Sequence, residues 1–114
     1  MTDTITIRKA PGKWSVRSGG AILGETNNAL ELLEGDKDPV IYFPRADIAM
    51  AFLDRTNKVT QCAGKGDATH FSIVNKSSVT ENAAWSYENP IDAVAEIKDH
   101  LAFYPADSIK VEQL

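Results

Sequence analysis

Apolar and polar residues alternate over several short stretches of the chain, which is the pattern of strands that bury one face. Ile5 and Ile7, for example, fall on the same side of an extended segment at residues 4–9. Glycine, proline and asparagine separate these stretches, as they do at turns. The pattern predicts strands at residues 4–9, around Trp14 and Val16, and at 21–23, 29–33, 40–43, 58–61, 69–74, 79–87 and 108–112, with a turn at 75–78.

One segment after the fifth strand has apolar residues at helical spacing. Pro44 ends the strand and fits the first turn of a helix, where its missing N–H is harmless. Ile48, Ala51 and Phe52 then share one helical face. These residues predict a short helix near 45–53.

A second helical pattern follows the last hairpin. Asn89 and Pro90 are typical of a helix start, with asparagine as the N-cap and proline in the first turn. A stripe of apolar residues then repeats at helical spacing, at Ile91, Val94, Ile97 and Leu101. This stripe predicts a longer helix near 90–103.

Length and composition fit one mainly β domain over residues 1–114. The chain has 43% hydrophobic and 25% charged residues, which is ordinary for a globular protein. Strands this short and this closely spaced predict an all-β core built from meanders.

Charge and targeting signals narrow the class of protein. The formal net charge of −4 argues against a nucleic-acid partner, because nucleic-acid-binding domains are usually basic. Asp3 stands where a signal peptide is positively charged, and no apolar run approaches the roughly 20 residues that span a bilayer. Cys62 is the single cysteine, so no disulfide can form within the chain. We therefore predict a reduced, cytoplasmic location without a membrane partner.

Charged and aromatic residues gather in four short segments of the chain. Each segment places charged groups beside an aromatic ring or a turn, which is the material of a binding site. They match no catalytic signature. The segments are residues 42–47, 62–67, 81–87 and 100–105.

Lys65 lies between Gly64 and Gly66, in a loop that suits neither helix nor strand. It is either a lysine exposed on a β-turn or a clamp that a mobile loop holds over a pocket to bind an anion. The Walker pattern of phosphate-binding loops is absent. Arg45 has similar alternatives, because it either pairs with Asp47 or makes a forked contact with a carboxylate or phosphate.

A third group of candidates alternates along the strand predicted at 79–87. Residues at every second position share a face, so this face would carry one acid, one small residue and two aromatic rings. It forms either the wall of a ligand slot or a part of the core whose polar tips bond to the backbone. The four residues are Glu81, Ala83, Trp85 and Tyr87.

Cys62, His70 and His100 are the soft metal ligands of the chain, and their spacing matches no known three-ligand motif. We therefore predict no metal and no cofactor. A nucleophilic pair of Cys62 and His70 stays open beside the more common half-buried cysteine.

Together, the four segments resemble the small bacterial and fungal proteins grouped as domain of unknown function family 427. The shared motifs are Tyr-Phe-Pro-Arg-x-Asp, Cys-x-x-Lys-Gly-x-Ala, Glu-Asn-x-Ala-Trp-x-Tyr-x-x-Pro and His-x-x-Phe-Tyr, over about residues 12–113. This family has also been labelled a nucleotidyltransferase. The resemblance carries over the positions Tyr42, Arg45, Asp47, Cys62, Lys65, Gly66, Glu81, Trp85, Tyr87, Phe103 and Tyr104.

The resemblance implies a β-tent, or Mss-four-like, fold, in which two small antiparallel sheets meet at an angle with helices at the periphery. Methionine sulfoxide reductase B and the thalidomide-binding domain of cereblon share this architecture. Many β-tent proteins hold zinc with four cysteines, which this chain does not have. It also departs from the family pattern at Ala63, where proline is expected, and at His70, where tyrosine or tryptophan is common.

The leading hypothesis is a domain, with or without catalytic activity, that binds a small anionic molecule. Arg45 and Lys65 would hold the anion, Asp47 or Glu81 would orient it, and aromatic rings would form the walls. The rivals are a reductase-like enzyme with Cys62 as nucleophile, a nucleotidyltransferase, and a protein-interaction module whose simplest form is a homodimer. The ligand-binding candidates are Tyr42, Arg45, Asp47, Cys62, Lys65, Glu81, Trp85, Tyr87 and Tyr104.

Overall fold

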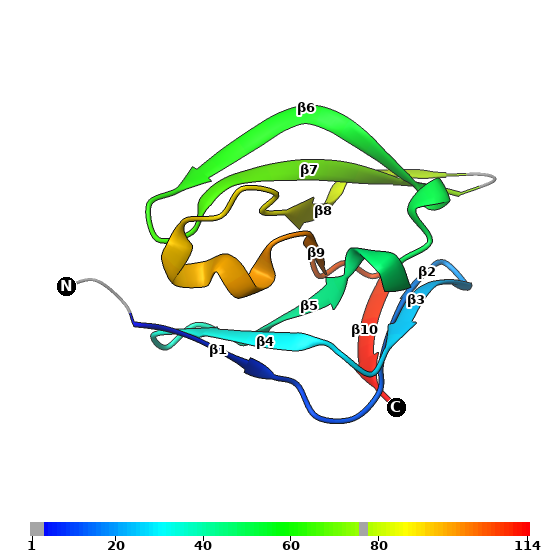
Figure 1. The fold of residues 1–114 in the computed structure, drawn as a ribbon. Coiled ribbons are helices and arrows are strands. Elements are labelled where there is room, and N and C mark those ends of the chain that lie inside the picture. The colour runs from blue at the N-terminus through cyan, green and yellow to red at the C-terminus, as the bar shows by residue number, and fades with distance from the viewer. Residues whose placement is uncertain (1–3, 76–77) are drawn as a thin grey trace.

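The computed structural model describes residues 4–75 and 78–114, and these form ten strands and three short 3-10 helices (Figure 1). All strands predicted from the alternation are present, while residues 76 and 77 of the predicted turn at 75–78 lie outside the described residues. The strands are β1 (Ile5–Lys9), β2 (Trp14–Ser18), β3 (Ala21–Thr26), β4 (Leu30–Glu34), β5 (Val40–Pro44), β6 (Leu53–Cys62), β7 (Gly66–Val74), β8 (Val79–Ser86), β9 (His100–Phe103) and β10 (Ile109–Gln113). The 3-10 helices are η1 (Arg45–Asp47), η2 (Met50–Phe52) and η3 (Asp92–Ile97).

The strands form two antiparallel sheets, which confirms the mainly β prediction. The large sheet has seven strands in the order β1-β4-β5-β9-β8-β7-β6, and the small sheet has three in the order β10-β2-β3. Figure 1 shows the small sheet standing across one end of the large sheet. The large sheet curves, so that η3 lies between its β7 and β4 sides (Figure 1).

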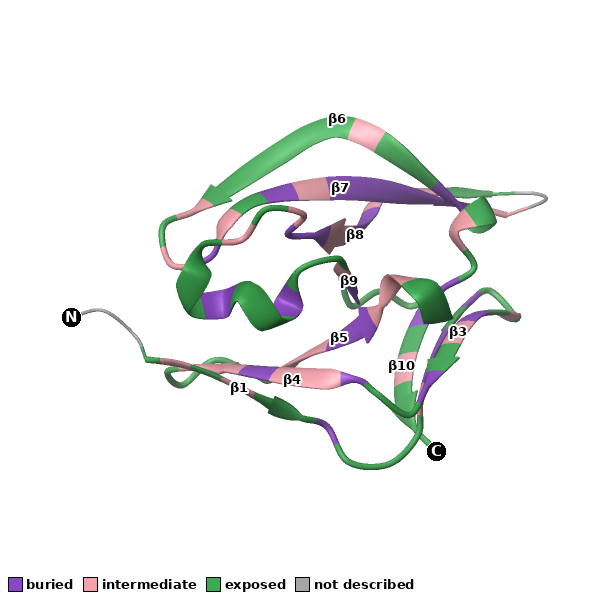
Figure 2. Cartoon of the chain, in the orientation of Figure 1, coloured by how far each residue is buried: buried purple, intermediate pink, exposed green. Residues whose placement is uncertain are grey.

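The central strands of the large sheet are buried on both faces because each face has its own cover, whereas the edge strand β6 is largely exposed. Tyr42 and Phe43 are neighbours on β5, so their side chains point to opposite faces. Phe43 packs in a first core with Val16 and Leu23 of the small sheet. Tyr42 packs in a second core with residues of η3. Figure 2 shows buried segments on the strands of both sheets and on η3.

The short helix predicted near 45–53 is present only in part, because no single continuous helix forms. The chain makes two separate 3-10 turns there, because Ile48 between them is extended, with φ −107° and ψ 137°. Ile48 is buried and forms an isolated bridge with Gly24 of β3. Strand β6 then begins at Leu53, earlier than the strand predicted at 58–61. Contact with the small sheet therefore overrides the local helical spacing.

The longer helix predicted near 90–103 is wrong. Only η3 is helical, and Val94 inside it has a non-helical φ of −125°. Asp99 adopts a left-handed φ of 57°, and the chain then enters β9. The residue before η3 is Ile91 rather than the predicted cap Asn89, and no side chain of the described residues caps it.

Of the apolar stripe of that predicted helix, Ile91 is exposed and the other three residues divide between the two cores. Val94 and Ile97 pack in the second core, whereas Leu101 packs in the first core as part of β9. The same spacing thus fits a 3-10 turn followed by a buried strand. None of the described helical segments is long and apolar enough to cross a membrane.

Candidate functional site

Several of the predicted residues meet at the turn between β6 and β7. The backbone N–H of Lys65 donates to the Cys62 carbonyl at 3.0 Å, which closes this turn. The Lys65 side chain is nearly buried, and its ammonium donates to the Glu34 carboxylate of β4 at 2.8 Å. The buried Tyr42 and Tyr87 lie close to these charges. We call these five residues the Lys65 cluster.

The charges of the Lys65 cluster stabilise each other. Burial lowers the pKa of Lys65, but the hydrogen bond that Lys65 donates to Glu34 and the nearby Tyr87 and Cys62 outweigh this effect, so the pKa is raised. The same bond lowers the pKa of the Glu34 carboxyl. Burial raises the pKa of both Tyr42 and Tyr87. Lys65 is therefore an ammonium that already has a carboxylate partner inside the protein.

Arg45 belongs to a different group of charges, which we call the Glu88 cluster. Arg55 donates two hydrogen bonds to the Glu88 carboxylate, at 2.8 and 2.7 Å, and Arg45 donates a third at 3.0 Å. The Thr69 hydroxyl adds a fourth at 3.3 Å. Both guanidinium groups lie over the ring of Phe71, at 5.6 and 5.3 Å from its centroid. The two predicted cations thus do not share a site, because Arg45 pairs with Glu88 and Lys65 with Glu34.

The Glu88 cluster predicts a loss of stability in acid. The two hydrogen bonds from Arg55, and then the one from Arg45, lower the pKa of Glu88 from 4.5 to about 2. A lowered pKa stabilises the fold above the unfolded-state pKa, and the contribution is lost as the pH falls from about 5 to about 2. Since Arg55 is half exposed, we expect Glu88→Gln to lower the free energy of unfolding by about 1–2 kcal/mol at neutral pH.

Urea unfolding at neutral pH and near pH 2 measures this difference, which should nearly vanish in acid. Glu31→Gln is the matched control, because Glu31 pairs with the largely exposed Arg8 and should cost under about 0.5 kcal/mol. Equal losses for both variants at every pH would contradict the prediction.

Asp47 joins η1 to the small sheet rather than pairing with Arg45. The Thr26 hydroxyl of β3 donates to the Asp47 carboxylate at 2.8 Å. The same hydroxyl accepts the backbone N–H of Asn28 at 2.9 Å. These contacts give Asp47 a role in the structure of the fold.

Strand β8 does not present its four candidates on one face, contrary to the prediction. Asn82 has a left-handed φ of 49°, and the pairing of β8 with β7 shifts register beside it. Such a bulge disrupts the ladder and the side-chain alternation locally. Glu81 is exposed, Ala83 packs in the first core, and Trp85 and Tyr87 pack in the second.

Trp85 and Tyr104 lie in a row of four aromatic side chains. The Trp85 indole N–H donates to the Tyr42 hydroxyl at 3.3 Å, and the Trp85 ring lies 4.4 Å from the ring of Tyr104. Tyr104 stacks on His70 at 5.9 Å, and its hydroxyl lies 3.0 Å from His70 Nε2. The row reaches the surface at Tyr104, which is 39% exposed, while Tyr42 and His70 at its two ends are buried.

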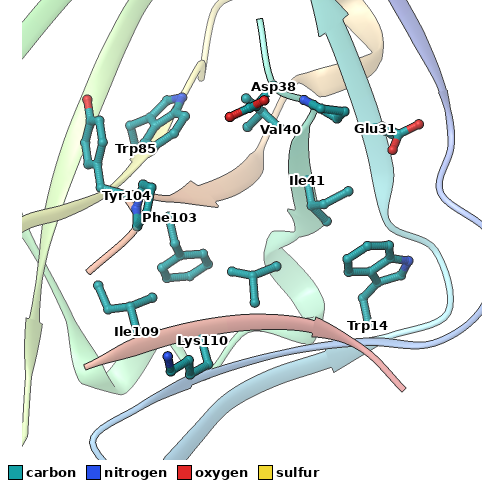
Figure 3. Close-up of a pocket in the computed structure, with 13 residues that line it drawn as sticks. Trp14, Glu31, Asp38, Val40, Ile41, Trp85, Phe103, Tyr104, Ile109 and Lys110 are labelled. Carbon is teal, nitrogen blue, oxygen red and sulfur yellow. The ribbon is translucent and has the colours of Figure 1, made fainter. Parts of the chain in front are cut away.

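A groove opens where β5 and β9 separate. These strands pair only at Phe43–Leu101 and Pro44–His100, so no backbone bonds of this ladder close the gap further along. The groove holds about 610 Å³, and Figure 3 shows side chains from several strands converging on it. We call it the aromatic groove. Its lining comprises Trp14, Glu31, Asp38, Pro39, Val40, Ile41, Trp85, Phe103, Tyr104, Pro105, Ile109, Lys110 and Val111.

Two smaller hollows continue from the aromatic groove. One of about 430 Å³ shares Tyr104 and Ile109 with the groove, and it shares Lys58 and Glu81 with a second hollow of about 560 Å³. Glu81 thus lies in a polar hollow beyond the aromatic groove. Tyr104 stands where the groove and the first hollow meet.

Neither acid that neutralises the predicted cations was among the residues predicted from the sequence. Glu34 ends β4 and reaches Lys65 only because β4 and the β6–β7 turn meet in space. Glu88 directly follows Tyr87 in the third motif, and this acid among aromatic residues was a usable signal. The groove residues of β5 and β10, such as Ile41 and Ile109, have only the apolar pattern of core residues in the sequence, which gives no sign of a binding site.

Within residues 4–75 and 78–114, no group of three or more His, Cys, Asp or Glu is placed to hold a metal ion. These features define an antiparallel β domain with an aromatic groove between its sheets. The chain belongs to the family described as Domain of unknown function (DUF427), whose sequence model matches residues 6–114. This confirms the membership that the four motifs predicted. No curated protein matches the chain.

Proposed function

We propose that this protein is a small-ligand-binding domain and that the aromatic groove is its site. The observation that carries this proposal is the groove itself, since about 610 Å³ falls within the range of about 300–1,000 Å³ that is usual for small-molecule sites. Its lining is mostly apolar and aromatic, with a few polar groups at the rim, as in such sites.

Arg45 and Lys65 have no direct part in this proposal. Neither lines the groove, and each already binds a carboxylate of the protein. Of the nine candidates, Trp85 and Tyr104 line the groove, and Tyr42 supports Trp85 from behind through its hydroxyl. We assign the ligand contacts to Trp85 and Tyr104.

The geometry favours neither Cys62 chemistry nor an interface built on Tyr87. Cys62 is half-buried in the Lys65 cluster and does not line the groove. Tyr87 is 5% exposed, which leaves almost no surface for a partner. The proposal is therefore one of binding, without an assigned reaction.

We also propose the β-tent architecture and a cytoplasmic location for this chain. Two antiparallel sheets that meet across one end support the first proposal. The single cysteine, which cannot form a disulfide within the chain, supports the second.

A thermal-shift screen of chemically diverse fragments tests the binding site. At tenfold its Kd a fragment stabilises the folded state by about 1.4 kcal/mol, which raises the Tm of a domain of this size by roughly 5 °C. We expect Tyr104→Leu to abolish the shifts. Phe52→Leu should keep them, because Phe52 is equally exposed at 39% but does not line the groove.

An Arg45→Ala/Lys65→Ala variant distinguishes binding in the aromatic groove from the anion-clamp hypothesis, in which Arg45 and Lys65 hold the ligand. Hits that survive Tyr104→Leu but disappear in this double variant would overturn the proposal. Hits that follow Tyr104 would place the site in the aromatic groove.

A further inference from the structure

We infer that the ligand of the aromatic groove carries a positively charged nitrogen, of the alkylammonium type, bound against Trp85 and Tyr104. This inference rests on the proposed function and adds the chemical class of the ligand. It reverses the charge that the sequence suggested, and three features of the groove support it.

The first feature is a pair of electron-rich rings in contact. Trp85 and Tyr104 both line the groove at one corner, with ring centroids 4.4 Å apart and planes tilted by 42°. The indole N–H is directed into the protein, where it bonds to Tyr42. The faces of Trp and Tyr rings attract cations, and two rings at one corner favour an ammonium group there.

The second feature is the way Tyr104 is held. His70 is buried, stacks on Tyr104 with an interplanar angle of 17° and contacts its hydroxyl at 3.0 Å. Burial lowers the pKa of His70, so the imidazole is neutral at physiological pH and puts no positive charge behind the site. A fixed ring loses little freedom on binding, which favours affinity.

The third feature is a carboxylate on the rim beside these rings. Asp38 lines the groove, and Figure 3 shows it along the same rim as Trp85. Among the described residues Asp38 forms no ion pair, so its charge can serve a ligand. Lys110 comes from β10 on the opposite side of the groove (Figure 3).

These features define a pose with two parts. The ammonium group lies between Trp85, Tyr104 and Asp38, where ring faces and a carboxylate surround it. An apolar substituent extends over Ile41 and Phe103, which form the floor toward the small sheet (Figure 3). The alkyl part buries apolar surface, and the charged part gives the selectivity.

Choline and its shape-matched analogues test the charge directly. The neutral analogue has a tert-butyl group in place of the trimethylammonium, and the anionic analogue has a carboxylate in place of the hydroxyl of that neutral compound. NMR titration of the wild-type protein follows the indole N–H signals of Trp14 and Trp85, which both line the groove. We expect choline to bind about tenfold more tightly than the neutral analogue, and the anionic analogue to bind most weakly.

Three variants assign the effect to named groups. Tyr104→Phe keeps the ring and should keep the preference for choline, while Tyr104→Leu should lose it. Asp38→Asn should weaken choline severalfold without changing the affinity for the neutral analogue. Phe52→Leu is the control of equal exposure and should change nothing.

The outcomes separate this inference from the proposed function. Equal affinity for choline and its neutral analogue, or tighter binding of the anion, would overturn the cation assignment while keeping the groove as a ligand site. Absence of binding by all three compounds would also overturn it. The fragment screen then decides on the groove itself.

Discussion

Replacing Lys65 by methionine is expected to lower the free energy of unfolding by about 2–3 kcal/mol. The substitution removes the ammonium from a nearly buried pair and leaves the Glu34 carboxylate beside Tyr42 and Tyr87 without its bond at 2.8 Å. Breaking a fully buried pair costs about 3–5 kcal/mol, and the partial exposure of Glu34 reduces this cost. Chemical denaturation measures the change.

Two further variants show that the effect belongs to the buried pair. Lys37 also faces Glu34, at 3.9 Å, but it is largely exposed, so Lys37→Met should cost under about 0.5 kcal/mol. The Lys65→Met/Glu34→Gln double variant should be more stable than Lys65→Met, because it removes the unpaired carboxylate. A Lys65→Met protein as stable as the wild type, but unable to bind ligands, would instead support the anion-clamp hypothesis.

Replacing Gly24 by alanine is expected to destabilise the fold by about 1–3 kcal/mol. A Cβ at this position would lie 2.6 Å from the backbone oxygen of Asp47 and 2.6 Å from Cδ1 of Ile48. Strand β3 pairs here with the segment around Ile48, and the Leu23 carbonyl accepts a hydrogen bond from the N–H of Ala49 at 2.7 Å. The contact with the Asp47 backbone oxygen cannot be relieved by rotating a side chain. The small sheet would therefore have to move away from η1.

Gly64→Ala is the matched control for this prediction. Its Cβ would meet only the flexible end of Ile5, at 3.3 Å, and its φ lies outside the left-handed region. We expect a change within about 0.5 kcal/mol for this variant. Similar losses at Gly24 and Gly64 in thermal denaturation would show that the close approach of β3 to Asp47 and Ile48 does not restrict the residue at position 24.

The strands could be predicted from the sequence because their signal is local. Ile5 and Ile7 alternate with polar residues, and Gly19 and Gly20, which both have positive φ, mark the turn between β2 and β3. The order of strands in the sheets, by contrast, depends on pairings between distant segments. β5 beside β9 is one such pairing, and no local pattern encodes it.

The helix predictions did not fully match the structure because the same spacing of apolar residues is compatible with more than one secondary structure. Ile48 fits a helical face, yet its bridge to Gly24 holds it in an extended conformation. Leu101 continues a helical stripe, yet it and Ala102 also fit neighbouring positions of a strand whose two faces are both buried. In both cases tertiary contacts decided between two locally acceptable structures.

The sequence indicated which types of residue the candidate site contains better than it indicated how these residues are arranged in space. Trp85 and Tyr104 lie in adjacent motifs of the sequence and do line one groove. Arg45 and Lys65 were expected to converge, but each found a carboxylate from another part of the chain. Glu81 was placed on the wrong face because the left-handed Asn82 interrupts the alternation. Long-range ion pairs and a single bulge are thus the reasons why the residues of the sequence motifs do not all meet in one site.

A crystal structure with the fragment that gives the largest thermal shift tests the central claim most directly. We predict density for the fragment in the aromatic groove, in contact with Trp85 and Tyr104. Density beside Arg45 and Glu88, or within the Lys65 cluster, with no fragment in the groove would contradict the assignment of the site.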